Sequence, residues 1–117
     1  MFLKFHLLSI NLKKNAYTKT LLDRKLLPII SLKAEEWRSK GPDEEGINPT
    51  FSQQLVSLKY DKPTNLIFIV IRDKDRLGEK VAEAQTKANV FLDNGTGELT
   101  IPLLKDEDTI GEIRFQT

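Results

Sequence analysis

The apolar run LIFIVI, at positions 66–71, constrains the fold of this chain more than any other stretch. It is far too short to span a bilayer, which takes roughly 20 residues of helix. The turn sequence KPTN precedes the run and the charged sequence RDKD follows it, so the apolar segment is one short element. Because the run is apolar on both faces, we expect it to form a central strand of a β-sheet.

Other segments also show strand patterns. LKFHLLSI alternates apolar and polar residues, the period-two signature of a half-buried strand. PIISLKAEEW begins with a proline, which suits the first residue of a strand. TFSQQLVSLKY has an alternation that slips, as at a β-bulge, and LTIPLL and TIGEIRFQT complete the set. KVAEAQTKANVFL fits a helix by its Ala, Glu and Lys content, and a strand by its valines.

Turn signals separate these segments. RSKGPDEEGINP is expected to be a loop, and DNGTGE is the strongest turn signal of the chain. Roughly eight short strands of this kind predict an all-β fold, an antiparallel eight-stranded β-sandwich, with helix confined to residues 13–25 or 80–92. We expect a single domain over residues 1–117, which can be the N-terminal piece of a longer protein. The residues predicted to face the space between the sheets are Leu3, Phe5, Leu7, Ile30, Leu66, Phe68, Val70, Ile101 and Ile113.

Composition narrows the possible functions. The chain has no cysteine and one histidine, His6, so disulfides, thiolate metal sites and histidine clusters are excluded within it. Its serines have no other candidate base, and catalysis is not expected; nor is any cofactor. A net charge of +1 without a recognition motif argues against nucleic acid. The N-terminus does not read as a signal peptide, so we expect a cytoplasmic protein that contacts a membrane peripherally if at all.

Four motifs in order resemble a known family. They are the opening strand LKFHLLSINL, the sequence NPTF at 48–51, the run LIFIVIRDKDRLGE, and FLDNGTGELTIPLL followed by GEIRF. Together they resemble the C2 domain, a calcium- and lipid-binding β-sandwich with a Greek-key arrangement, of which this chain would be a divergent member. Because the chain starts directly with the first strand, it is similar to the circular arrangement of the novel protein kinase C and phospholipase branches.

The resemblance implies where calcium would bind. Five aspartates from two loops hold the ion in the family, and calcium needs about six to eight oxygen ligands. Asp73 and Asp75 match the first two positions of the later loop, with Glu79 nearby, but Lys74 and Arg76 stand beside them. In the first loop Asp23 is the only acid. We therefore interpret Asp73, Asp75 and Glu79 as relic ligands and expect no tight metal site.

Charge is distributed unevenly along the chain. Residues 1–40 carry nine Lys or Arg against three Asp or Glu, whereas the remaining 77 carry nine against fourteen. The candidate lipid- or partner-binding residues within the basic part are Lys13, Lys14, Tyr17, Lys19, Leu21, Leu22, Arg24 and Lys25. Near an anionic membrane each such cation gains about 1 kcal/mol. The competing interpretation is a solvated loop.

Two functions of different class follow. The first is a calcium-independent signalling module that docks a protein partner and makes auxiliary contact with anionic phospholipid; the acidic loops GPDEEG and KDED and the single Trp37 favour it. Trp37 is expected to be half-buried on a strand, or else an exposed anchor. The alternative is a membrane-targeting, phospholipid-binding domain that depends on calcium only if a cryptic site exists. The oligomeric state, the partner and the lipid stay open.

Overall fold

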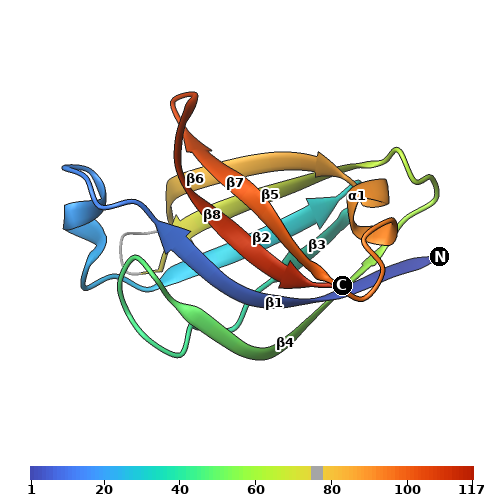
Figure 1. Ribbon diagram of the computed structural model, residues 1–117, viewed down its shortest axis with the longest axis horizontal. Coiled ribbons are helices and arrows are strands. Elements are labelled where there is room, and N and C mark those ends of the chain that lie inside the picture. The colour runs from blue at the N-terminus through green and yellow to red at the C-terminus, as the bar shows by residue number, and fades with distance from the viewer. Residues whose placement is uncertain (75–77) are drawn as a thin grey trace.

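The computed structural model describes residues 1–74 and 78–117, and in that part of the chain it has eight antiparallel strands and two short helices (Figure 1). The strands are β1 (Phe2–Leu12), β2 (Leu26–Leu32), β3 (Glu35–Arg38), β4 (Thr50–Lys59), β5 (Leu66–Asp73), β6 (Glu79–Lys87), β7 (Glu98–Lys105) and β8 (Asp108–Gln116). A 3₁₀ helix, Thr18–Leu21, lies between β1 and β2, and α1 (Ala88–Leu92) lies between β6 and β7.

The strands follow one another in the sheet in the order β3-β2-β5-β6-β7-β8-β1-β4. The sheet curls between β6 and β7, which are paired through one residue pair, Glu83 and Leu104. As a result β3-β2-β5-β6 form one layer and β7-β8-β1-β4 the other, and β1 and β8 cross in front of β2 in Figure 1. The predicted eight-stranded sandwich is confirmed. The apolar run at 66–71 is β5, a central strand between β2 and β6.

Side chains from both layers form one hydrophobic core. Six residues predicted to face it are buried, namely Leu3, Phe5, Leu7, Ile30, Ile101 and Ile113. The prediction for β5 is wrong: Ile67, Ile69 and Ile71 are buried, whereas Leu66 and Phe68 are 40% and 43% exposed and Val70 is half-buried. Since both faces of this strand are apolar, the residue pattern could not show which one turns inward.

The alternation in β4 slips as expected. Phe51 and Gln54 are both buried although they are three positions apart, and the pairing of β4 with β1 shifts between Leu7 and Ser9. A shift of this kind, in which one strand has extra residues opposite its partner, is a β-bulge. The predicted loop before β4 is also confirmed, with residues 39–49 outside any strand.

The ambiguous segment at 80–92 contains both structures that were considered. Its first part is β6, and its last five residues form the one-turn helix α1. The helix closes one end of the sandwich, because the ring of Phe91 stacks on Phe5 with centroids 4.2 Å apart and meets Phe115 edge-on at 5.4 Å. Phe5 and Phe115 are themselves in edge contact. We call this cluster, together with α1, the aromatic end.

Candidate binding surface at the loop end

The opposite end of the sandwich, which we call the loop end, brings together loops that are distant in the sequence. It contains the basic loop (residues 13–25), the acidic loop (residues 39–49) and the turn between β7 and β8, as the left side of Figure 1 shows. Gly46 of the acidic loop donates its backbone N–H to the carbonyl of Arg24, 2.9 Å away. The residue after β5, Lys74, likewise donates to the carbonyl of Lys25. Backbone hydrogen bonds therefore fix the relative positions of these loops.

Thr18 gives the basic loop its shape. Its side chain is fully buried, and its hydroxyl donates to the carbonyl of Lys13 at 2.6 Å. Asn15 and Thr18 also bond reciprocally, each accepting the backbone N–H of the other at 2.8–2.9 Å. Hydrogen bonds of this local kind give the backbone an ordered alternative to helix or strand. The loop accordingly presents Lys13, Lys14 and Lys19 to solvent as a defined surface.

Tyr17 and the two leucines occupy different environments. Tyr17 is half-buried and donates its hydroxyl to the carbonyl of Val81, which attaches the basic loop to β6. Leu22 is 56% exposed, as expected for a residue that contacts a partner or a membrane. Leu21, expected in the same role, lies elsewhere: the 3₁₀ helix turns its side chain into the core, where it is 5% exposed.

Arg24 faces inward rather than toward a membrane. Its Nε atom lies 3.9 Å from Oδ2 of Asp73, at the end of β5, and 3.5 Å from Oδ1 of Asp23. The Asp73 side chain is 1% exposed and that of Arg24 is 25% exposed. The strand pairing explains the contact, because Leu26 at the start of β2 is opposite Asp73. One of the predicted relic ligands thus lies beside a permanently charged guanidinium group.

The other two predicted relic ligands do not extend this site. Glu79 is exposed at the first position of β6, opposite Asp73, and Asp75 lies outside the described residues. Within residues 1–74 and 78–117, no three His, Cys, Asp or Glu side chains are grouped so that they could hold a metal ion. The described carboxylates at this end are therefore spread along the loops.

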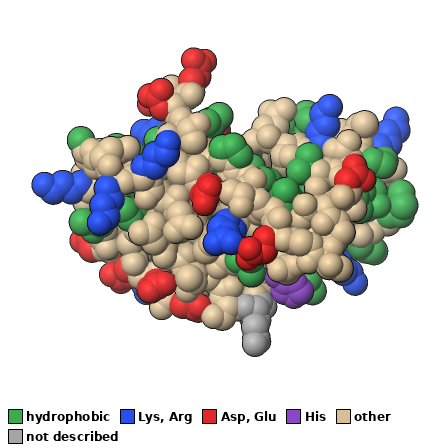
Figure 2. All heavy atoms as spheres, viewed as in Figure 1, with side chains coloured by type: hydrophobic (Ala, Val, Ile, Leu, Met, Phe, Trp, Pro, Cys, Tyr) green, Lys and Arg blue, Asp and Glu red, His purple; other side chains and the backbone are tan. Residues whose placement is uncertain are grey.

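Acidic side chains flank the basic loop on two sides. On one side are Asp43, Glu44 and Glu45 of the acidic loop; Asp43 accepts hydrogen bonds from Ser52, and Glu44 accepts one from Thr50. On the other side are Asp106 and Glu107 in the turn after β7 and Asp108 at the start of β8, all exposed. Figure 2 shows Lys and Arg side chains projecting from this end, with acidic groups near them. The loop end is a surface of mixed charge.

Sequence reasoning missed one member of this surface. The Nζ atom of Lys105 lies 4.4 Å from the centroid of the Tyr17 ring, a cation–π contact that joins the basic loop to the turn after β7. Lys105 is adjacent to three acids, so in the sequence it counts as part of the KDED loop. No local signal could have indicated a ring 88 positions away.

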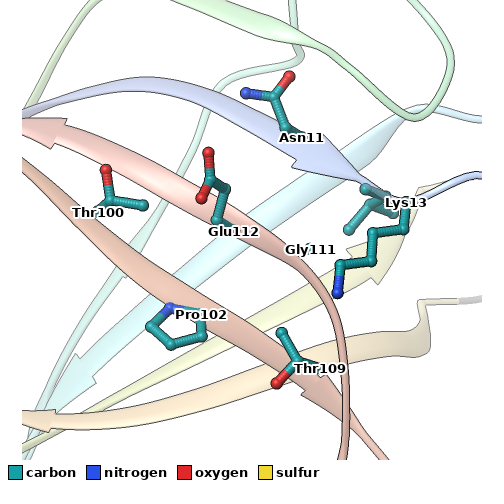
Figure 3. A pocket seen from close by; sticks show the side chains of 8 residues that line it. Asn11, Lys13, Thr100, Pro102, Thr109, Gly111 and Glu112 are labelled. Carbon is teal, nitrogen blue, oxygen red and sulfur yellow. The ribbon is translucent and has the colours of Figure 1, made fainter.

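A shallow hollow lies next to the basic loop on the outer face of β1, β7 and β8 (Figure 3). Asn11 and Glu112 project from neighbouring strands on one side of it, and the side chain of Lys13 reaches across Gly111 toward Thr109. A Cβ atom on Gly111 would lie 2.3 Å from the carbonyl oxygen of Asn11, so only glycine fits where β1 and β8 come this close. The hollow adjoins the loop end at Lys13.

Two further single side chains lie on the strands. Trp37 is half-buried on β3 and packs against the core, as predicted for a strand residue. His6 is exposed on β1, between its cross-strand neighbours Leu55 and Gln116. Among the described residues no helix is long and apolar enough to cross a membrane.

Solved structures with this architecture identify the fold. The chain is similar to a C2 domain-containing protein attributed to an elicitor-responsive gene, with a TM-score of 0.80 and 20% identity over 98% of this chain and 85% of that one. It is also similar to a C2 domain of plant extended synaptotagmin 1, with a TM-score of 0.70 and 14% identity over 98% of this chain and 90% of that one. No protein-family model and no curated protein matches the sequence.

The fold is therefore that of a C2 domain, as the resemblance of the sequence implied. The two solved structures cover nearly the whole chain, so the C2 fold accounts for all eight strands. The circular arrangement of the novel protein kinase C branch stays a prediction.

Proposed function

We propose that this chain is a non-catalytic interaction module that acts without calcium, docking a protein partner through the loop end and contacting anionic phospholipid as an auxiliary. The observation that carries the proposal is the charge pattern of that end. Exposed lysines of the basic loop stand between two groups of exposed acids. A surface of both signs complements the mixed charges of a polypeptide better than the uniform negative charge of a membrane.

Calcium independence is supported by the Arg24–Asp73 contact. In the C2 fold, the acids that follow this strand are the ones expected to coordinate the ion. Here the guanidinium group of Arg24 approaches Asp73 to 3.9 Å, so a fixed positive charge stands beside the carboxylate that the ion would need. The guanidinium group and a calcium ion are both positive, and like charges in a poorly solvated site repel strongly. Arg24 thus supplies the cation that calcium would otherwise provide.

Auxiliary lipid contact is supported by three exposed lysines and one exposed leucine. Lys13, Lys14 and Lys19 project from the basic loop, and Leu22 is positioned to enter the interface. Each lysine near an anionic surface contributes about 1 kcal/mol, which the neighbouring acids diminish. The loop alone therefore gives weak, salt-sensitive membrane binding. A stable complex requires a protein partner.

The absence of catalytic function is supported by the placement of the candidate residues. The only histidine is exposed on the outer side of β1, and its cross-strand neighbours carry no acid that could orient it. An acid–base or nucleophilic mechanism needs a positioned base within hydrogen-bond reach of its partner. A binding surface requires neither.

Charge neutralisation at two matched places tests the proposal. One variant replaces Lys13, Lys14 and Lys19 by Gln; the control replaces Lys4, Lys59 and Lys62, three exposed lysines outside the loop end. Both variants lose three positive charges. Binding is measured by co-sedimentation with phosphatidylserine vesicles and by fluorescence anisotropy with a labelled peptide in which lysine and glutamate residues alternate.

We expect the first variant to lose binding to both probes, and the control to bind as the unmodified protein does. When the three lysines are replaced one at a time, the loss of vesicle binding should be gradual, because each lysine acts through the general field of the surface. For the peptide, one or two lysines should dominate, as in a protein interface. Equal losses in both variants would show that only net charge matters, and would refute a docking site at the loop end.

A further inference from the structure

The outer face of β5 exposes large apolar side chains. On its inner face Ile67, Ile69 and Ile71 are fully buried, while on the outer face Leu66 and Phe68 are 40% and 43% exposed. Strands that are apolar on both faces are ordinarily covered on both. The core covers one face of β5, and the other is open in the single chain.

The apolar surface extends from β5 onto its neighbour β2. Val70 on β5 is paired with Ile29 on β2, and both are half-buried on the outer side because Ile69 and Ile30 point inward. Phe68 is paired with Ser31 of β2, a small side chain that leaves the ring uncovered. We call the surface formed by Ile29, Leu66, Phe68 and Val70 the outer stripe. It is on the layer away from the hollow of Figure 3.

Charges border the outer stripe in a specific order. Through the strand pairing, Ile29 is next to Arg38 on β3, and Val70 is next to Glu83 on β6. One row across four strands therefore reads Arg38, Ile29, Val70, Glu83, with a cation at one end and an anion at the other. In the following row, Glu36 occupies the β3 end and Phe68 the middle.

A row with this order is complementary to itself. When a second copy is placed face to face and turned by a two-fold axis parallel to the strands, β3 of one copy lies over β6 of the other. Arg38 then lies opposite Glu83 in both halves of the interface, and Ile29 lies opposite Val70. Self-complementarity of a single patch is the requirement for a symmetric dimer.

The bordering charges can change partners at little cost. In the single chain Arg38 pairs with Glu36 at 3.0 Å, and Glu83 pairs with Lys80 at 3.1 Å. All four side chains are about half exposed or more. Exposed pairs of this kind contribute little to stability, so exchanging them for pairs between copies opposes association only weakly. Two further cations border the stripe: Lys87 is paired with Leu66 across β5 and β6, and Arg72 follows Val70 on the outer side of β5.

We propose that the outer stripe is the interface of a homodimer, in which two copies of this chain pack β2 and β5 face to face. The inference is independent of the proposed docking at the loop end, since the stripe and the basic loop are on different parts of the molecule. The apolar side chains drive association, and the opposed Arg38 and Glu83 determine the orientation.

Sedimentation velocity over a range of protein concentrations tests the dimer. We expect the full chain to shift from one copy to two as concentration rises through the micromolar range. Phe68→Ser should raise the dissociation constant by about tenfold or more, as for a residue at the centre of an interface. Leu55→Ser, which alters an exposed leucine on β4, should leave it unchanged. A single species of monomer mass at all concentrations would refute the dimer and leave the stripe to a different protein.

A charge exchange tests the orientation. Arg38→Glu alone and Glu83→Arg alone should each weaken dimerisation, because like charges then face each other. The double variant should restore it, since each copy again presents opposite charges. The control exchanges Arg114 and Glu98, an ion pair of the other layer with 2.7 Å between its charged atoms, and should have no effect on the mass distribution. A double variant as weak as the single ones would overturn the proposed arrangement.

Discussion

The two ends of the sandwich are stabilised by different interactions. At the aromatic end, three phenylalanine rings from β1, α1 and β8 are in mutual contact and almost fully buried. At the loop end, the stabilising contacts include hydrogen bonds of Thr18 and Tyr17, the ion pair of Arg24, and backbone hydrogen bonds between the loops. Apolar burial makes one end a structural closure, whereas the polar contacts of the other leave charged side chains available at the surface. The difference separates the part that stabilises the fold from the part proposed to bind.

Truncating a ring at the aromatic end should have the largest effect on stability. Phe91→Ala removes a side chain that is 2% exposed and leaves a cavity beside Phe5 and Phe115. Losses for buried aromatic residues are about 3–5 kcal/mol. Chemical denaturation measures this change, and vesicle binding at the loop end should be unaffected below the unfolding transition. A stable variant with lost vesicle binding would contradict the separation of the two ends.

A pair of substitutions on β5 tests which face is inside. Ile69→Ala should cost about 2–5 kcal/mol, because Ile69 is fully buried. Phe68→Ala, in contrast, should cost about 0.5 kcal/mol or less when measured at concentrations where the chain is monomeric, as is typical of exposed positions. Urea unfolding of both variants compares them directly. If Phe68→Ala were the more destabilising of the two, the assignment of Ile69 to the buried face of β5 and of Phe68 to the exposed face would be wrong.

Breaking the ion pair of the loop end should have an intermediate effect. Arg24→Gln removes the positive charge beside the buried Asp73 carboxylate. Breaking a fully buried pair costs about 3–5 kcal/mol. Here Arg24 is a quarter exposed, lies closer to Asp23 at 3.5 Å, and leaves Asp73 with a further interaction, so we expect about 1 kcal/mol. Lys25→Gln, at the next position, serves as the control and should change stability little. Equal stability of both variants would mean that the pair does not hold the loop.

The smallest effect is expected at an exposed pair near the aromatic end. The hydrogen bond from Lys33, 2.7 Å from the Asp61 carboxylate, lowers the pKa of Asp61 from its ordinary value of 3.8. The resulting stabilisation is present above pH 3.8 and is lost as the pH falls through the lowered pKa. In Lys33→Ala, the pKa measured by carbon NMR should return toward the ordinary value. An unchanged pKa would exclude Lys33 as its cause.

The sequence predicted the fold class because strand patterns and turn signals are local. Alternation identified Leu3, Phe5 and Leu7 as core residues, and their burial follows directly from the period of a strand. Alternation gave the wrong face for Phe68, because in a run that is apolar on both sides the residue types do not show which side is buried. Only the register of β5 with β2 and β6 determines which side faces the core.

The candidate site was predictable only in part. The exposed lysines of the basic loop follow from the charge distribution, which is visible in the sequence. The inward positions of Leu21 and Arg24 do not follow from it, because they depend on how the 3₁₀ helix is turned and on an aspartate 49 positions away. The contact of Lys105 with Tyr17 is non-local in the same way. Long-range pairing of strands, which no single segment encodes, brought these groups together.

The central claim of our proposal is that the loop end binds its partners without calcium. Calcium titration of the unmodified protein by isothermal calorimetry, together with vesicle binding in calcium and in chelator, tests it most directly. We predict no saturable heat up to millimolar calcium, and equal vesicle binding in the two buffers. A dissociation constant at or below about 10 μM, within the range of calcium sensors, would contradict the claim.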